Sequence, residues 1–295
     1  MKFKMLVFFL LAVSLMACSA AKAPVSPEPS SLLTMAPTSL PAEAATPKAT
    51  QALAANPIEL HVFAAASLTE TMQQLAKVYE SKNSGVKIVY TLDSSGTLKT
   101  QIQQGAVCDL FISAAQKQMN QLEAGNKANT ESLDFVAKET RVNLVENKVT
   151  LVVPKDNPAG VTSFKDIVGD KVKKIALGNK DVPVGQYSEE ILKNLGIWDS
   201  IQAKVTLGSN VKEVTTWVSS GVVDCGIVYA TDAFSAGLQV VDEATAEMLK
   251  TPVVYPAAVM KASKYQAEAK AFLDFLQTPD AQKVFEDLGF AIPEK

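Results

Sequence analysis

The order of apolar and polar positions along the chain repeatedly predicts a strand that turns directly into a helix. Largely apolar runs at 58–66 and 86–92 end close to Ser67 and Ser95, and helical spacing of apolar residues follows each serine. The same order of strand, turn and helix recurs at 174–195 and 203–219. This alternation predicts an α/β fold with mainly parallel sheets flanked by helices.

Two extended, proline-bounded runs suggest how the folded part is divided. The runs at 150–154 and 252–260 lie far apart in sequence, and we expect them to be paired crossings between two lobes. The C-terminal helices would then return to the first lobe. The expected division is a first lobe of 58–143 plus 262–295 and a second lobe of 144–261. An ordinary single sheet containing both runs is the alternative.

The first residues have the pattern of an export signal. Lys2 and Lys4 precede the apolar stretch 5–17, which is short for a membrane span. Residues 15–18 resemble a lipobox, the signal at which a bacterial lipoprotein is cut before a cysteine that is then acylated. The signal peptide is therefore predicted to be 1–17, with the lipid on Cys18; simple cleavage near Ala23 is the alternative.

Residues 18–57 are predicted to be a tether. Pro, Ala, Ser and Thr dominate this segment, which has no apolar periodicity and too little apolar surface to offset the entropy of ordering. A flexible chain of this length spans about 35 Å on average. Such a tether would hold a folded body away from a membrane surface.

Charge and rare residues exclude several classes of site. The net charge is −3 and Arg141 is the only arginine, so the basic stripe of a nucleic-acid-binding protein is absent. The single histidine, His61, lies inside a strand pattern. Cys108 and Cys225 flank apolar runs and are predicted to be small buried side chains, with a disulfide between them left open. Zinc or haem bound by histidine or thiolate is therefore not expected.

The two serine turns are a candidate anion site. A helix start presents unpaired N–H groups and a partial positive charge, and in open α/β sheets ligands gather where strands end. Small residues at 64–66 and Gly96 would let backbone approach a ligand, and the turns at 183–185 and 209–211 are similarly uncrowded. Alternatively, Ser67 and Ser95 are helix caps worth about 1 kcal/mol each. Tyr229, at the end of an apolar strand, is either a core residue or a neutral donor.

Neutral amides and hydroxyls suit a fully ionised oxyanion, which has acceptors and carries no proton. A protonated oxyanion such as hydrogen phosphate would favour an added acceptor. Asp93 would supply one, although a turn aspartate is also a common structural residue.

Signals of catalysis are weak. Ser209 and Lys212 have the Ser-x-x-Lys spacing of penicillin-binding acylases, but the partner motifs of that class are absent. His61 is the one residue that could complete a Ser–His pair, and its place in a strand favours a packed side chain. The sequence also lacks a phosphate-binding loop. The chain is predicted not to be an enzyme, with a Ser–Lys hydrolase as a distant alternative.

Seven segments together resemble the periplasmic molybdate-binding proteins that feed ABC transporters. They recur in order over nearly all of 58–292 and lie at 62–69, 94–98, 106–114, 181–187, 195–198, 226–233 and 255–259. The resemblance implies a two-lobed type II periplasmic-binding-protein fold with the ligand in the cleft between the lobes. It also implies hinge closure, delivery to a membrane permease, a monomer, no cofactor and a lipid-anchored protein facing the periplasm or the cell exterior.

The resemblance further implies a particular set of ligand contacts. They are the hydroxyl and amide of Ser67, the same groups of Ser95, the amides of Val184 and Val211, and the hydroxyl of Tyr229. Relatives often carry alanine in place of Val184, which keeps the amide, and serine in place of Gly96, which removes a hydroxyl here. The implied cargo is molybdate, with tungstate as an equal ligand and with molybdenum bound only as its oxyanion. Sulfate or phosphate is the runner-up.

Overall fold

The computed structural model describes residues 57–294. The predicted signal peptide 1–17, the lipid site Cys18 and the tether up to residue 56 lie outside the described residues, so these predictions stay predictions. Within the described part of the chain, no helix is both long enough and apolar enough to cross a membrane.

The secondary structure alternates between strands and helices as the apolar pattern predicts. The strands are β1 (Ile58–Ala65), β2 (Val86–Asp93), β3 (Leu110–Ile112), β4 (Val142–Glu146), β5 (Val149–Val153), β6 (Ile175–Gly178), β7 (Val205–Gly208), β8 (Cys225–Tyr229), β9 (Gln239–Glu243) and β10 (Val254–Val259). The α-helices are α1 (Thr69–Lys82), α2 (Ser95–Gln103), α3 (Gln116–Leu122), α4 (Pro183–Asn194), α5 (Trp198–Ile201), α6 (Val211–Ser219), α7 (Ala230–Ala236), α8 (Gln266–Leu276) and α9 (Pro279–Asp287). Short 3₁₀ helices lie at Ala66–Leu68, Lys138–Thr140, Phe164–Val168 and Gln202–Lys204.

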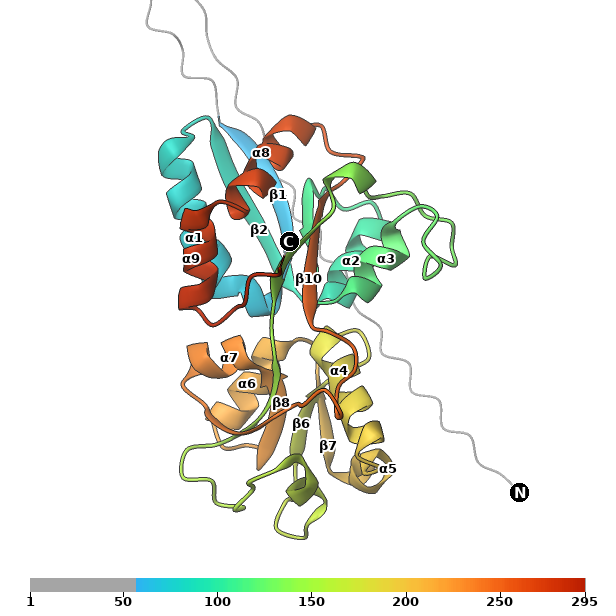
Figure 1. Cartoon of the computed structure of the whole chain (residues 1–295), viewed down its shortest axis with the longest axis vertical. Coiled ribbons are helices and arrows are strands. Elements are labelled where there is room, and N and C mark those ends of the chain that lie inside the picture. The colour runs from blue at the N-terminus through green and yellow to red at the C-terminus, as the bar shows by residue number, and fades with distance from the viewer. Residues whose placement is uncertain (1–56, 295) are drawn as a thin grey trace, which may run out of the picture. The chain divides into compact units, whose positions relative to one another are not determined.

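The strands form two five-stranded sheets, one in each of two lobes (Figure 1). The first has the order β2-β1-β3-β10-β4 and the second the order β7-β6-β8-β5-β9. In each sheet four strands run in one direction, and a single strand, β10 or β5, runs against its neighbours. The predicted two-lobed α/β fold with mainly parallel sheets is confirmed.

The first sheet is covered by helices on both faces. Val62 and Ala64 of β1 belong to one apolar cluster, whereas Phe63 between them belongs to another with Leu98 of α2 and Met119 of α3. This follows from the two-residue period of a strand, which sends neighbouring side chains to opposite faces. Figure 1 shows α1, α8 and α9 on one side of the sheet and α2 and α3 on the other. Burial on both faces explains why β1 is more continuously apolar than a half-exposed strand.

The chain crosses between the lobes at two places, and these differ from the predicted boundaries. β4 pairs with β10, and β10 pairs with β3, so residues 144–146 and 254–259 belong to the first lobe and not to the second. The run at 150–154 forms β5 of the second sheet. The crossings are the short links just before β5 and just before β10. They lie side by side, and the backbone N–H of Asn147 in one link donates to the carbonyl of Val253 in the other at 3.0 Å. The apolar runs alone did not locate the crossings between the lobes, because the strands before and after each crossing are similarly buried.

Candidate functional site

The predicted donors converge on a small cavity between the lobes. Its volume is about 10 Å³, close to the space that one water molecule needs. Four of the five predicted residues line it, namely Ser67, Ser95, Val211 and Tyr229. Val184 does not line it and is fully buried, although Val182 and Pro183 directly before it do. The other lining residues are Ala65, Ala66, Asp93, Ser94 and Ala114.

Neither of the two predicted serines is a helix cap. The cap of α2 is Ser94, whose hydroxyl oxygen accepts the N–H of Thr97 at 3.2 Å. Ser95 instead accepts the N–H of Ala114 at 2.9 Å, which leaves its own proton available to donate. Ser67 lies in the 3₁₀ turn before α1, and the side chain at the N-cap of α1 makes no capping bond. The capping alternative is therefore wrong for both serines.

A chain of hydrogen bonds connects Ser67 to the crossing between the lobes. The side-chain amide nitrogen Nδ2 of Asn147 donates to the hydroxyls of Thr231 at 2.8 Å and Tyr255 at 3.2 Å. The phenol oxygen of Tyr255 lies 2.9 Å from Oγ of Ser67. Because Asn147 occupies an acceptor position on Tyr255, the phenol proton can be given to Ser67, and the proton of Ser67 is free to point into the cavity.

Sequence reasoning missed the roles of Tyr255 and Asn147. Tyr255 lies in one of the segments that carry the family resemblance, so a signal was present, but it marked the segment without assigning a function to the phenol. Asn147 had no signal, because its importance comes from the meeting of two crossings far apart in sequence.

Four backbone N–H groups at the site lack an acceptor within the described part of the chain. They belong to Ser67, Ser95, Val184 and Val211. Ser95 and Val211 are the first residues of α2 and α6, and Val184 follows the proline that begins α4. The first N–H groups of a helix have no partner inside the helix and carry a partial positive charge. Three helices from two lobes therefore bring donors and positive potential to the same region.

Tyr229 is a core residue that also lines the cavity. Its ring packs against the rings of Tyr187 and Tyr255, with centroids 6.4 and 5.7 Å away, so it is part of the core. It also lines the cavity, where its hydroxyl lies 3.4 Å from the carbonyl oxygen of Ala114 in the other lobe. Burial raises the pKa of Tyr229 well above its usual value, and burial does the same for Tyr255. Both phenols are neutral and keep their protons.

Asp93 is the one charged residue among those lining the cavity. Its Oδ1 accepts the N–H of Ser94 at 2.7 Å and the side-chain amide of Asn210 at 3.3 Å. Asn210 belongs to the other lobe, so this carboxylate ties the lobes together. These contacts favour the structural role over the predicted acceptor role toward a protonated ligand.

An ion-paired cluster lies close to the cavity at α6. Lys212 contacts Glu70 of the other lobe at 2.8 Å and the fully buried Asp232 at 3.1 Å. Burial raises the pKa of Asp232 to about 6, partly offset by Lys212. Burial alone would lower the pKa of Lys212, but the carboxylates of Asp232 and Glu70 raise it. Lys212 therefore remains charged and occupied by protein carboxylates.

The same contacts argue against the Ser–Lys hydrolase. The hydroxyl of Ser209 donates to the carboxylate of Glu213 at 2.9 Å, while Lys212 binds Glu70. A serine nucleophile needs its base within hydrogen-bond reach, and here each side chain has a different partner. The Ser-x-x-Lys spacing of Ser209 and Lys212 therefore reflects the start of α6 and not a catalytic pair.

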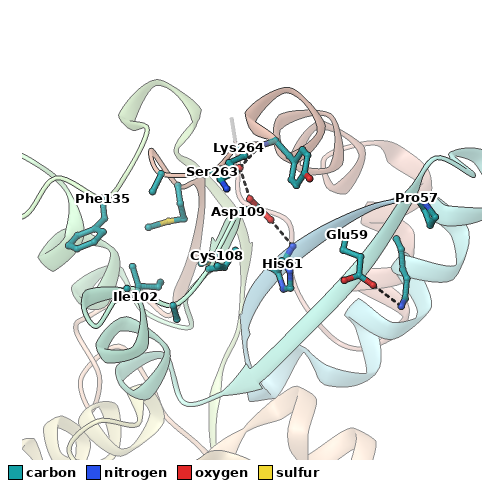
Figure 2. Close-up of a pocket in the computed structure, with 16 residues that line it drawn as sticks. Pro57, Glu59, His61, Ile102, Cys108, Asp109, Phe135, Ser263 and Lys264 are labelled. Carbon is teal, nitrogen blue, oxygen red and sulfur yellow. Dashed lines mark hydrogen bonds and ion pairs between the residues drawn. The ribbon is translucent and has the colours of Figure 1, made fainter. Parts of the chain in front are cut away.

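A much larger cavity, about 820 Å³, lies elsewhere on the first lobe and contains none of the predicted donors (Figure 2). His61 and Asp109 line it together with Ser263. The Asp109 carboxylate accepts the backbone N–H of His61 at 2.8 Å and the hydroxyl of Ser263 at 2.6 Å. Because the hydroxyl bonds to the carboxylate and not to the imidazole, these three residues are not a catalytic triad.

The two cysteines of the described region are both buried and unpaired, so the disulfide left open by the sequence is not formed. Burial raises the pKa of Cys225 to about 12 and raises that of Cys108 further. Among residues 57–294, no group of three or more His, Cys, Asp or Glu side chains is arranged to hold a metal ion.

Comparison with known proteins agrees with this geometry. The family model of bacterial extracellular solute-binding proteins matches residues 60–291. A putative ABC transporter substrate-binding lipoprotein of Bacillus subtilis, YvgL, is 39% identical over 79% of this chain and 86% of its own length. The molybdate-binding protein ModA of Haemophilus influenzae is 34% identical over 78% of this chain and 89% of its own length. The solved substrate-binding domain of a putative molybdenum ABC transporter from Clostridium difficile is 39% identical, with a TM-score of 0.60 over 80% of this chain and 99% of that domain.

Two lobes joined by paired crossings, with hydrogen-bond donors from both lobes facing one cavity, have the architecture of a binding protein. The chain belongs to the family of bacterial extracellular solute-binding proteins, which bind solutes and are not enzymes.

Proposed function

We propose that this protein captures molybdate, with tungstate as an equal ligand, and delivers it to the permease of an ABC transporter. The observation that carries the proposal is the convergence of neutral donors from both lobes on one cavity that no lysine or arginine lines. The names of relatives at 34% identity supply the particular oxyanion.

The proposed ligand contacts are the predicted ones. The hydroxyls of Ser67 and Ser95 donate from the first lobe, with their oxygens already occupied by Tyr255 and Ala114. The free amides of Val184 and Val211 donate from the second lobe, and the phenol of Tyr229 donates once its proton turns from the carbonyl of Ala114 to the ligand. Each bond to a dianion is charge-assisted, so neutral donors together balance a double negative charge without a cationic side chain.

Binding is proposed to proceed by closure at the crossings near Asn147 and Val253. The ligand joins donors from both lobes, so it binds the closed form better than the open form and shifts the population toward closure. The closed form is then the one that docks on the permease. Selection against sulfate would follow from cavity size, since molybdate has the same charge and shape with longer bonds.

The protein is proposed to be an exported monomer, anchored to the membrane by a lipid on Cys18 and held off the surface by the tether. The extracellular description of the family and the lipoprotein name of the Bacillus relative support this location.

Isothermal titration with molybdate, tungstate, sulfate and phosphate tests the ligand. We expect molybdate and tungstate to bind much more tightly than the other two. Ser67→Ala should weaken molybdate binding by about 1–3 kcal/mol, because it removes one charge-assisted hydrogen bond. Ser219→Ala, at an exposed serine in α6, is the matched control and should bind as the wild type does. Sulfate or phosphate binding as tightly as molybdate would refute the proposed specificity.

A further inference from the structure

Gly96 makes a direct main-chain contact between the two lobes. It is the second residue of α2 in the first lobe, and its N–H donates to the carbonyl of Asp181 in the second lobe at 3.0 Å. Asp181 lies two residues before Pro183, where α4 begins. This bond therefore joins the N-terminus of the helix that presents Ser95 to the N-terminus of the helix that presents Val184.

The contact leaves no room for a side chain at Gly96. A Cβ atom built there would lie 2.3 Å from the carbonyl oxygen of Asp181, 2.8 Å from its Cβ and 2.9 Å from its carbonyl carbon. Real Cβ contacts are essentially never shorter than 3.0 Å. Two of these three atoms are backbone, so the clash cannot be relieved by rotating a side chain.

The conformation of Gly96 does not itself require glycine. It lies inside a helix, and its φ is not among the positive values found at other glycines. An alanine would fit the backbone of the first lobe, and would even favour the helix. The three nearest atoms that would clash with a side chain all belong to Asp181 of the opposite lobe. The sequence predicted that Gly96 lets backbone approach a ligand, but the backbone that approaches it belongs to the second lobe.

We propose that Gly96 is a closure-determining residue: its missing side chain sets how closely α2 and α4 approach, and with it the size of oxyanion the cavity accepts. This inference rests on the proposed function, because the cavity in question is the proposed ligand site. Two other contacts between the lobes, Asn210 with Asp93 and Lys212 with Glu70, hold the α6 side of the cavity. Gly96 controls the α4 side, where Val182 and Pro183 line the cavity.

The test compares Gly96→Ala with Gly85→Ala. Gly85 lies in the turn before β2, has a φ outside the left-handed region, and a Cβ there would meet nothing within 4 Å. Molybdate affinity of the purified protein is measured by isothermal titration, and the melting temperature is measured with and without molybdate. Small-angle X-ray scattering records how far each protein compacts when molybdate is added.

We expect Gly96→Ala to bind molybdate roughly 5- to 150-fold more weakly than wild type, the range that follows from overpacking a tight contact. It should compact less on adding molybdate, while its melting temperature without ligand is unchanged or higher. Gly85→Ala should bind and compact as wild type does. Gly96→Ser, which carries the same Cβ plus a hydroxyl, should also bind more weakly. Relatives often carry serine at this position, but in this chain the Asp181 carbonyl occupies the space that a Cβ would need.

Each contrary result has a distinct meaning. A wild-type protein that binds neither molybdate nor tungstate refutes the proposed function, and the inference falls with it. A wild type that binds while Gly96→Ala binds within twofold of it refutes the inference alone. Gly96→Ser binding as tightly as wild type would also refute it, because the lobes would then tolerate a side chain. A lower melting temperature of Gly96→Ala without ligand would show that glycine serves the fold and not closure.

Discussion

Removing a single oxygen atom from Tyr255 tests whether the crossing between the lobes is coupled to the ligand site. Tyr255→Phe keeps the ring, which is fully buried and packs against Tyr229 and Phe290 with centroids 5.7 and 5.6 Å away. The phenol bonds to Ser67 at 2.9 Å and to Asn147 at 3.2 Å are lost. The substitution creates almost no cavity, so its effect reports on hydrogen bonding.

The structure sets the size of the effect. A neutral hydrogen bond contributes about 0.5–1.5 kcal/mol net, so losing two lowers the free energy of unfolding by about 1–3 kcal/mol. Asn147 keeps its 2.8 Å bond to Thr231, which places the loss toward the lower end. Ser67 loses the donor that fixes its hydroxyl. We expect molybdate binding to weaken by about 1 kcal/mol, close to fivefold in Kd.

A double-mutant cycle separates the coupling from a general loss of stability. Kd for molybdate is measured by titration for wild type, Ser67→Ala, Tyr255→Phe and the double variant. If Tyr255 acts on the ligand through Ser67, adding Tyr255→Phe to Ser67→Ala changes Kd by less than about twofold. Tyr265→Phe, at a tyrosine 37% exposed, is the control. Fully additive losses would refute the argument, because Tyr255 would then act by a route that does not pass through Ser67.

Two further predictions follow from buried ionisable groups. The pKa of Asp232 is raised from 3.8 to about 6 in the folded protein, so the folded state binds this proton more tightly. The contribution of Asp232 to stability therefore falls as the pH rises from about 4 to about 6. Asp232→Asn should therefore gain stability relative to wild type by on the order of 3 kcal/mol over that range, measured by urea unfolding, and parallel pH curves would contradict this. Cys108 and Cys225 should react with a thiol reagent only after unfolding, because both are buried and their pKa values are raised. Peptide mapping after labelling checks this, and labelling in the folded protein would argue against it.

Much of the fold could be predicted because each strand pattern ends in a recognisable helix start. The strand–turn–helix order at 203–219 contains β7 and α6, and the run at 150–154 lies within one residue of β5 at each end. β9 escaped prediction because it is a largely exposed strand whose residues show no apolar alternation. The boundaries of the lobes were not predicted because β10, about a hundred residues after β4, inserts between β3 and β4. Pairing between strands far apart in sequence depends on the whole sheet, so the local sequence pattern does not predict it.

The candidate site was predictable to the extent that it is built from helix starts. The amides of Ser95 and Val211 are unpaired because of where their helices begin, and that position can be read from the sequence. The role of Gly96 is set by atoms of the other lobe, and the role of Tyr255 is set by side chains far from it in the sequence. Only the structure could reveal that Ser94, and not Ser95, caps α2 and so leaves the Ser95 hydroxyl free.

The way the chain passes through both lobes also determines the order in which the lobes are completed during synthesis. The second lobe is one uninterrupted stretch of chain between Asn147 and Val253, with its two ends side by side. The first lobe needs β10 from near the C-terminus, since β4 pairs with no other named strand of its sheet. During synthesis the second lobe therefore has all its strands first, whereas the lobe that presents Ser67 and Ser95 is finished last. A chain that stops before β10 is expected to fold one lobe and to capture nothing.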